Sequence, residues 1–292
     1  GAEAAARGGE SGRCGRGWAG ADAVGELAHQ IDLDVLRCFP QVPRLQTSEA
    51  RGALRQVLLA CACKHAEGGE PLAYHQGFHE LAAAMLLVCW DGSCPEPPPW
   101  PAEAGQATYF ELSSADAAIA DATALLDGLL RTIGLAELYA PASSLSVSAQ
   151  EPVAILCCRQ IIAGVRHGDP DLGRQVEAWG IEPHVLLLGW LRLLFLRALG
   201  FPGAALTAWD LIFADCAAHD GRLPALTGTS ASGEGPPALF ICLAVAMILE
   251  GRPSSPEHLL RFEERPCDFG RVVARALQLQ EAASLDADHP IR

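Results

Sequence analysis

Gln76 and Gly77 are the residues in this sequence that most directly suggest chemistry. They lie in the stretch Leu72-Ala73-Tyr74-His75-Gln76-Gly77-Phe78-His79-Glu80-Leu81, just before apolar residues that recur at helical spacing. A helix start offers free N–H groups and the positive end of the helix dipole, which favour an anion such as a phosphate. A glycine there lets another backbone or a ligand approach closely. Ordinary helix starts have the same pattern, so the string alone leaves both interpretations open.

A second polar group lies upstream, where Ile31, Asp34 and Arg37 follow one another at intervals of three. In a helical turn these residues share a face. Asp34 can then orient the Arg37 guanidinium, whose planar fork suits phosphate oxygens. The alternative interpretation is a surface salt bridge beside a helix end, which is common and stabilises little.

Together the two groups resemble the TBC domain family, the GTPase-activating proteins for Rab GTPases. The resemblance rests on Ile-x-x-Asp-x-x-Arg at 31–37, followed by Tyr-x-Gln-Gly at 74–77. A third block fits in the same order: Gly189-Trp190-Leu191-Arg192-Leu193-Leu194-Phe195, then Phe201-Pro202, then Trp209-Asp210-Leu211-Ile212-Phe213-Ala214. The resemblance covers roughly residues 20–265. The wording at Arg37-Cys38-Phe39-Pro40 and at 76–81 is most similar to the member-five subgroup.

The resemblance implies a two-lobed, all-α TBC domain that activates the GTPase of a partner Rab. Arg37 is then the arginine finger and Gln76 the glutamine finger, both supplied in trans to the Rab. GTP and Mg would be carried by the Rab, and the chain would need no cofactor of its own. The supporting or Rab-contacting residues that it implies are Asp34, Tyr74, Gly77 and Ile31.

Three functions stay open at this point. The first is an active Rab activator, which assists a reaction of its partner and has no independent one. The second is a catalytically silent module of the same fold that holds a Rab or a sorting complex in vesicle trafficking. The third is an unrelated helical scaffold. The presence of both Arg37 and Gln76 favours the first, since a pure binder needs neither.

Other candidate residues favour structural interpretations. His79 and Glu80 are adjacent, so in a helix they point about 100° apart and at most one should face a site. His75 and His79 have the spacing of a zinc pair but lack the H-E-x-x-H pattern and a third ligand, so no metal site is expected. Trp209 is expected to anchor the core. The sequence has no G-x-x-x-x-G-K-[ST] phosphate loop and no G-x-S-x-G serine hydrolase motif.

Composition narrows the partners. The 292 residues include 35 acids and 21 bases, which gives a net charge of −14. This charge argues against a general nucleic-acid binder, which needs a basic footprint, and against electrostatic docking on anionic membranes. Half of the residues are hydrophobic, enough for a sizeable core.

The cysteines and the apolar runs favour a chain that stays in a reducing compartment. Eleven cysteines are present, without C-x-x-C or zinc-site spacing, so we expect no disulfides. The uncharged run 238–249 is too short to span a bilayer, and Arg192 and Arg197 interrupt the run 185–199. Residues 1–17 lack the apolar centre of a signal peptide. These features predict a cytoplasmic protein without a membrane span, and its expected partner implies peripheral recruitment to endomembranes.

The elements that must position these residues are expected to be helices, since no period-2 strand is visible. Glycine-rich residues 1–21 are expected to be poorly ordered, followed by an N-terminal lobe at 22–148 with both fingers and a C-terminal lobe at 149–292. The family's N-terminal Arg-x-x-x-Trp pattern is not matched, and proline-rich 91–106 reads as an inserted loop. The helices are expected at 22–30, 50–66 with Ser48 as N-cap, 78–90, 108–133, 153–166, 171–179, 183–199, 204–218 and 238–250, with one or two more between 256 and 281.

Overall fold

The computed structural model describes residues 20–64, 74–92, 117–139, 152–219, 221–223, 238–264, 268–286 and 289–291. Every regular element in these ranges is a helix, so the predicted all-α class is confirmed. The first half contains α1 (Gly20–Leu36), η1 (Pro43–Gln46), α2 (Ser48–Lys64), α3 (Phe78–Gly92), α5 (Ala118–Asp127), the π-helical η2 (Gly128–Thr132) and η3 (Leu135–Tyr139). The second half contains α6 (Val153–Gly168), α7 (Pro170–Ala178), α8 (Pro183–Arg192), α9 (Gly203–Ala218), α10 (Leu239–Gly251), α11 (Pro256–Leu260), η7 (Phe262–Glu264) and α12 (Phe269–Leu285).

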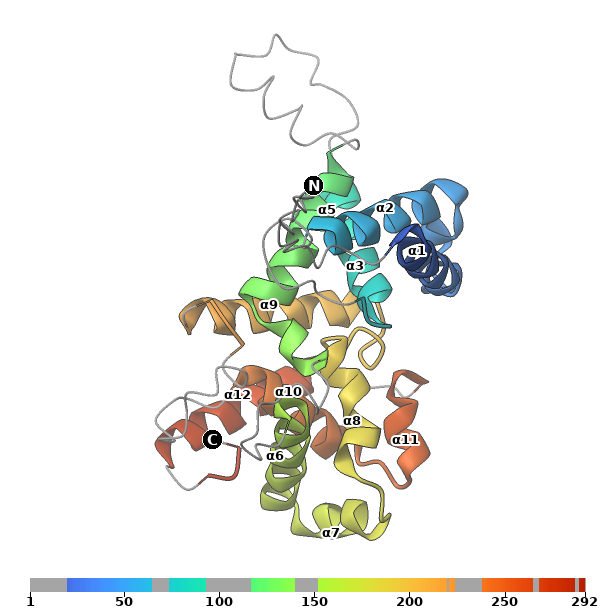
Figure 1. Cartoon of the computed structure of the whole chain (residues 1–292). Coiled ribbons are helices and arrows are strands. Elements are labelled where there is room, and N and C mark those ends of the chain that lie inside the picture. Colours follow the sequence, from blue (N-terminus) through green and yellow to red (C-terminus); the bar gives the residue numbers. More distant parts are fainter. Residues whose placement is uncertain are drawn as a thin grey trace, which may run out of the picture.

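The helices form two groups along an elongated molecule (Figure 1). Helices α1, α2, α3 and α5 form the upper group, and α6, α7, α8, α10, α11 and α12 the lower one. Helix α9 crosses between them, and η3 packs on both α6 and α8. The predicted division at 148 lies outside the described residues, as do the segments 1–19 and 93–116.

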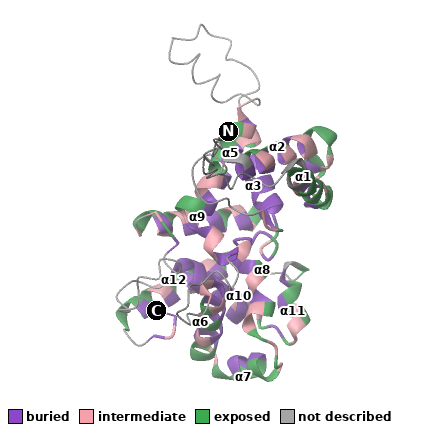
Figure 2. Cartoon of the chain, in the orientation of Figure 1, coloured by how far each residue is buried: buried purple, intermediate pink, exposed green. Residues whose placement is uncertain are grey.

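Helix α3 is the centre of the upper group. Every residue from Phe78 to Leu87 is buried, and α2 and α5 pack against it. Its counterpart below is α10, where residues 239–249 are all buried between α6 and α12. Figure 2 shows these two helices in purple. A helix that is buried on all sides belongs in a core, and each of these two organises one group.

Close packing around α10 depends on a glycine of α6. A Cβ atom at Gly164 would lie 2.8 Å from Val245 Cγ2 and 2.4 Å from Ile291 Cγ2. Contacts that short force neighbouring groups to move, so the absence of a side chain lets α6, α10 and the residues near the C-terminus meet.

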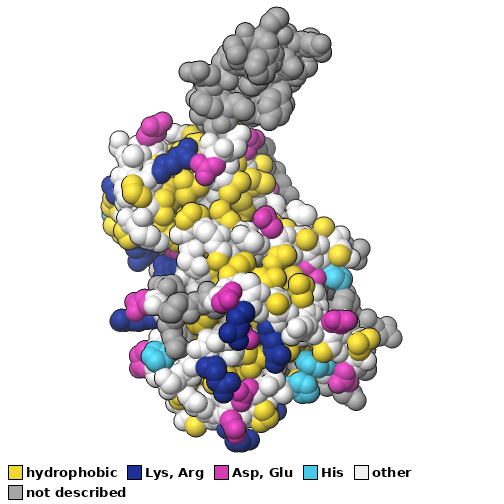
Figure 3. All heavy atoms as spheres, turned by 180° about the vertical axis from the view of Figure 1, so that it is seen from behind, with side chains coloured by type: hydrophobic (Ala, Val, Ile, Leu, Met, Phe, Trp, Pro, Cys, Tyr) yellow, Lys and Arg dark blue, Asp and Glu magenta, His cyan; other side chains and the backbone are white. Residues whose placement is uncertain are grey.

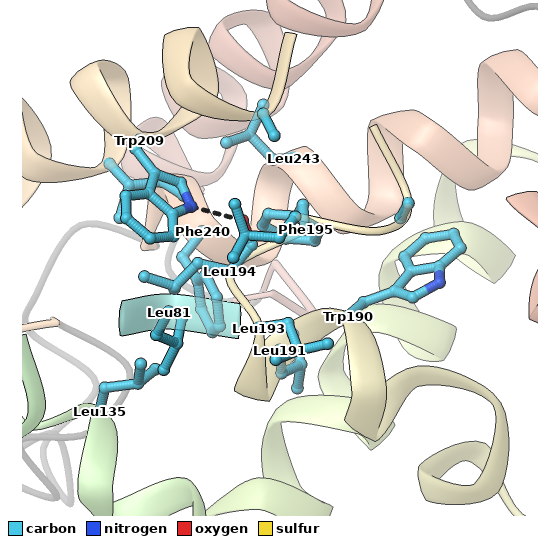
Figure 4. Close-up of a cluster of buried hydrophobic side chains, with 14 of the residues drawn as sticks. Leu81, Leu135, Trp190, Leu191, Leu193, Leu194, Phe195, Trp209, Phe240 and Leu243 are labelled. Carbon is cyan, nitrogen blue, oxygen red and sulfur yellow. Dashed lines mark hydrogen bonds between the residues drawn. The ribbon is translucent and has the colours of Figure 1, made fainter. Parts of the chain in front are cut away.

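The helix predicted at 183–199 is wrong in its second half. Helix α8 ends at Arg192, and Leu194 and Phe195 have φ angles of +45° and +65°. Both side chains are fully buried, and the Trp209 indole N–H donates to the Leu194 carbonyl at 2.8 Å (Figure 4). Burial is therefore kept while the backbone leaves the helix, because a side chain from α9 binds the released carbonyl. An apolar run alone does not distinguish these two arrangements.

The predicted N-cap of α2 is also wrong by one residue. The hydroxyl of Thr47, rather than that of Ser48, accepts a hydrogen bond from the Ala50 N–H at 3.1 Å. A capping oxygen must lie outside the helix to reach the free N–H groups of its first turn, and Ser48 already lies in the helix. The predicted helix at 22–30 begins two residues earlier, at Gly20, and continues through Ile31 and Asp34 to Leu36, so that Arg37 lies just beyond its end.

Charged side chains of both signs share the face of the molecule opposite to that of Figure 1 (Figure 3). In the second half of the chain, Arg252 pairs with Asp169 at 2.8 Å and Arg271 pairs with Glu250 at 2.9 Å. Within the described ranges, none of the helices combines the length and the apolar character needed to cross a bilayer.

Candidate functional site

A tight turn at the end of α1 presents Arg37. The N–H groups of Arg37 and Cys38 donate to the carbonyls of Asp34 and Val35 at 3.3 and 3.2 Å. The Gln46 amide then donates to the carbonyls of Cys38 and Phe39, both at 3.0 Å. These bonds bind the carbonyls that follow the helix end, so the backbone below Arg37 is fixed while its side chain is 56% exposed.

Asp34 restrains the Arg37 side chain from inside the protein. Its carboxylate is buried, and Oδ1 accepts a hydrogen bond from Arg37 Nη2. Oδ2 accepts a bond from the Tyr74 hydroxyl at 2.7 Å. Burial and this bond to Asp34 raise the pKa of Tyr74, so its hydroxyl keeps the proton that it donates. Asp34 thus links the end of α1 to the segment that leads into α3.

Gln76 lies two residues after Tyr74, and it is exposed in the turn that opens α3. Gly77, behind it, has a φ angle of +110°, and a Cβ atom there would lie 3.1 Å from Leu193 Cδ2 and 3.2 Å from the Tyr139 hydroxyl. Glycine is required by both the backbone angle and the lack of space. Gly77 is therefore buried against Leu193, which follows α8 of the lower group, and against Tyr139 of η3. The Gln76 side chain is exposed and points away from the core.

His79 occupies the space beneath this turn. Its Nδ1 accepts a hydrogen bond from the Gly77 N–H at 3.4 Å and lies 3.7 Å from Asp34 Oδ2. Its Nε2 lies 3.6 Å from Glu80 Oε1. Burial lowers the pKa of His79 against the opposing effect of Glu80 and Asp34. We assign the neutral ring with its proton on Nε2, because Nδ1 is used as an acceptor.

Glu80 holds a second arginine across the two groups of helices. The Arg197 guanidinium donates from Nε to Glu80 Oε2 at 2.8 Å and from Nη2 to Oε1 at 2.5 Å. The Glu80 side chain is buried, whereas that of Arg197 is 59% exposed. This is the bidentate geometry in which arginine binds a carboxylate most strongly.

A pocket of about 460 Å³ lies between the two arginines. Phe39 and Phe201 form one part of its wall, with ring centroids 4.4 Å apart and planes inclined by 26°. The residues that line it are Arg37, Phe39, Pro40, Gln41, Glu80, Leu196, Arg197, Gly200 and Phe201.

Comparison with known proteins decides the family. The Rab-GTPase-TBC domain family is matched over residues 21–220, more than half of the sequence. This chain belongs to that family. A solved structure, the crystal structure of the Ypt/Rab-GAP domain of Gyp1p, matches with a TM-score of 0.58 and 16% sequence identity. The match covers 88% of this chain and 74% of that chain, and it shows a common fold. No curated protein matched.

In this TBC domain the predicted site residues occupy one continuous region. Asp34, Ile31 and Gly77 are buried, and Tyr74 is half-buried between the α1 turn and the α3 turn. Arg37 and Gln76 lie at the surface above them. Of the adjacent pair His79 and Glu80, both side chains are buried and Glu80 lines the pocket.

Two residues of the site were not identified from the sequence of the TBC domain. Arg197 is separated from Glu80 by 117 positions, and Tyr139 packs beneath Gly77 from η3. Arg197 left one signal, since it interrupts an otherwise apolar run and a charge in such a run needs a partner. Nothing in the sequence marks Tyr139.

The described residues of the TBC domain contain no group of three or more His, Cys, Asp or Glu side chains that could hold a metal ion. His75, the other member of the zinc-spaced pair, stacks on Tyr139 with ring centroids 5.4 Å apart. Cys38 beside the site is a buried thiol that donates to the His79 carbonyl at 3.6 Å, and burial raises its pKa to about 12. It is therefore a packing residue rather than a nucleophile.

Proposed function

We propose that this chain stimulates GTP hydrolysis by a Rab GTPase and supplies both an arginine and a glutamine to the reaction. The observation that carries the proposal is the shared anchor: Asp34 binds Arg37 directly and binds Tyr74, two residues before Gln76. One buried carboxylate therefore binds the Arg37 side chain directly and holds the segment before Gln76 through Tyr74. A surface salt bridge would not need a buried carboxylate with a second hydrogen bond from another segment.

The proposed role of Arg37 is to neutralise charge in the transition state. As GTP is hydrolysed, negative charge spreads over the transferred phosphoryl group and the leaving oxygen, and an arginine supplied in trans accelerates the reaction by about 10³ to 10⁵. The geometry of Arg37 suits this task, because Asp34 restrains one edge of the guanidinium while more than half of the side chain is exposed. A side chain that is already restrained loses less conformational entropy when it binds a phosphate.

The proposed role of Gln76 is to orient the attacking water. A glutamine amide can accept from the water through its oxygen and donate to a phosphoryl oxygen or a Rab backbone group through its nitrogen. The exposed position at the opening of α3 allows the side chain to enter a partner's site. Gly77 allows this turn to be built, Tyr74 holds it to Asp34, and Ile31 anchors the end of α1 in the core.

The finer features of the proposal concern the partner. GTP and Mg would be carried by the Rab, together with its phosphate loop. The similarity of 37–40 and 76–81 to the member-five subgroup supports a place in vesicle trafficking, with peripheral recruitment to endomembranes and a trafficking complex as a further partner.

Single-turnover GTP hydrolysis by a panel of purified Rab GTPases, with and without the chain, tests the proposal. We expect Arg37→Ala and Arg37→Lys each to reduce stimulation by about 10³, since lysine keeps the charge but lacks the planar fork. Arg55→Ala is the matched control, because Arg55 is similarly exposed on the N-terminal helices and pairs with Asp32 at 2.9 Å. Full stimulation by folded Arg37→Ala protein would refute the arginine assignment.

The role of Gln76 is tested by measuring stimulated hydrolysis for the four combinations of wild-type or Gln76→Ala chain with wild-type or switch-glutamine-to-alanine Rab. We expect Gln76→Ala to abolish stimulation of a wild-type Rab, whereas a Rab whose switch glutamine is replaced by alanine stays substantially stimulated. The reverse pattern would place the water-orienting amide on the Rab. Tight binding of the wild-type Rab without stimulation, unaffected by aluminium fluoride in the GDP state, would instead assign the silent binding module.

A further inference from the structure

Two arginines of this molecule are built in the same way. Arg37 is paired with Asp34 and Arg197 with Glu80, and both carboxylate side chains are at most 4% exposed. Each arginine side chain is more than half exposed. Arg252 and Arg271 differ, since their partner carboxylates are 20% and 22% exposed and face solvent beside them. A molecule approaching Arg37 therefore meets the cation with its counter-charge behind it, and one approaching Arg197 meets an exposed cation whose partner Glu80 is largely buried in the pocket wall.

The two pairs meet at one buried histidine and form with it a network, the contact cluster of Arg37, Asp34, His79, Glu80 and Arg197. His79 lies between them, with Nδ1 facing Asp34 Oδ2 at 3.7 Å and Nε2 facing Glu80 Oε1 at 3.6 Å. Arg37 and Arg197 are far apart in the sequence, but the three side chains between them, Asp34, His79 and Glu80, are all buried and adjacent. Arg197 also comes from the turn after α8, so the network spans both groups of helices.

The pocket lies between these cations. Its volume of about 460 Å³ falls in the range of ligand sites, roughly 300–1,000 Å³, so it can receive more than one side chain. One part of its wall is apolar, from the stacked rings of Phe39 and Phe201. Its rim is accessible, because Pro40 and Gln41 are exposed. The pocket thus offers an apolar surface and an exposed guanidinium at short range.

We infer that this pocket binds an acidic side chain of the partner GTPase through Arg197, with an apolar neighbour of that side chain against Phe39 and Phe201. The inference rests on the proposed function, which assigns Arg37 to the phosphoryl group and leaves Arg197 for docking. Charge complementarity selects the occupant, because a chain of net charge −14 repels acidic partners except where cations are exposed. Arg197 is a docking residue in this assignment, so it acts on KM rather than on kcat.

Gln41 allows a test that leaves the buried network intact. It is exposed, it lines the pocket, and a charge placed there changes the potential without touching Glu80 or Arg197. With the Rab that responds best in the panel, we expect Gln41→Glu to raise KM roughly threefold and Gln41→Lys to lower it by a similar factor, with kcat nearly unchanged. Both effects should shrink at high salt.

The matched controls are Gln278→Glu and Gln278→Lys, which make the same charge changes at an exposed position of α12. They should leave KM unchanged. Arg197→Lys provides a second measurement, since it keeps a positive charge beside Glu80 but loses the fork; we expect a raised KM, with folding checked by thermal unfolding.

The outcomes separate the two proposals. Opposite shifts of KM at position 41, absent at 278, support the pocket. Stimulation by the wild-type chain with no change of KM in either Gln41 variant overturns the pocket alone. A common shift of KM for both charges also overturns it, because that result reports a disturbed surface rather than an electrostatic contact. Absence of stimulation by the wild-type chain on every Rab overturns the proposed function and this inference with it.

Discussion

Asp34 and Asp215 are two largely buried aspartates with opposite tasks. In the upper group of helices, Asp34 binds Arg37, whose side chain reaches into solvent. Asp215, on α9, has a side chain that is 9% exposed, and its partners belong to α10 and α12 of the lower group. Its Oδ2 accepts from the Leu239 N–H at 3.0 Å and its Oδ1 from the Gln280 amide at 2.9 Å.

Two carboxylates with similar burial thus have different roles: Asp215 stabilises the packing of helices, and Asp34 holds an exposed arginine. Asp215 binds the first N–H of α10 and a side chain of α12, so it ties three helices of the core together. Asp34 holds a cation whose side chain is more than half exposed. A buried charge costs free energy unless it is paired, and retaining one to orient a surface arginine indicates a task for that arginine.

Of the changes that compare the two aspartates, Asp34→Asn should have the largest effect on activity. The amide keeps the size of the side chain but loses the charge that restrains Arg37, and misplacement of a catalytic group can lower the rate on the order of 10²-fold. We expect stimulated hydrolysis to fall by about that factor in single-turnover assays. Asp32→Asn, on the same helix and paired with Arg55 at 2.9 Å, should have almost no effect. Equal rates for Asp34→Asn and wild type would remove the distinction between the two buried aspartates.

Asp215→Asn should show the complementary behaviour. Replacing the carboxylate weakens its bonds to Leu239 and Gln280, and a buried group left unsatisfied costs about 1–3 kcal/mol. We expect the free energy of unfolding, measured by urea denaturation, to fall by that amount. The stimulated rate of the folded protein should not change. A lowered rate at full stability would mean that the lower group takes part in the chemistry.

The pH dependence of stability sharpens the comparison further. His79 between Asp34 and Glu80 has a lowered pKa, chiefly because it is buried, against an ordinary value of 6.5. The positive charges of Arg37 and Arg197 lower it further, while the two carboxylates raise it. Above pH 6.5 the ring is neutral in both the folded and the unfolded chain. As the pH falls below that value, His79 takes up a proton in the unfolded chain but stays neutral in the folded chain, so the free energy of unfolding decreases.

The measurement is the free energy of unfolding between pH 7 and pH 5. His79 contributes at most about 1.4 kcal/mol per pH unit, and His79→Gln should remove that share of the slope. His289→Gln serves as a reference in the lower group, where burial and the neighbouring His167 lower the pKa of His289. An unchanged slope in His79→Gln would show that this ring does not stay neutral in the folded protein.

The smallest effect is expected from Tyr74→Phe. This change removes one hydrogen bond to Asp34, worth about 1 kcal/mol, which corresponds to roughly a fivefold loss of stimulated rate if the bond orients Arg37 and Gln76. Tyr139→Phe is the matched change, because its hydroxyl donates to the Arg192 carbonyl at 2.8 Å. We expect Tyr139→Phe to lower the melting temperature more than the rate. A larger loss of rate from Tyr139→Phe would place the critical bond under Gly77.

Much of the fold could be predicted from the sequence because the pattern is local. The apolar spacing after Gly77 and the uninterrupted apolar run at 238–249 correspond to α3 and α10. The helix predicted at 183–199 failed because its end depends on a partner, the Trp209 indole, that comes from another helix. The N-cap was misplaced for a related reason, since adjacent Thr47 and Ser48 are equally good candidates until the backbone shows which one lies outside the helix.

The sequence by itself determined the helical class, the polar triplet ending at Arg37, and the position of Gln76 before a helix. These properties follow from spacing along one segment, where helical geometry fixes which residues share a face. The tertiary structure alone decided that Tyr74 reaches Asp34 and that Glu80 holds Arg197 from 117 positions away. It also decided that a pocket separates the two arginines. Such contacts depend on how whole helices pack, and many distant pairs are compatible with the same local pattern.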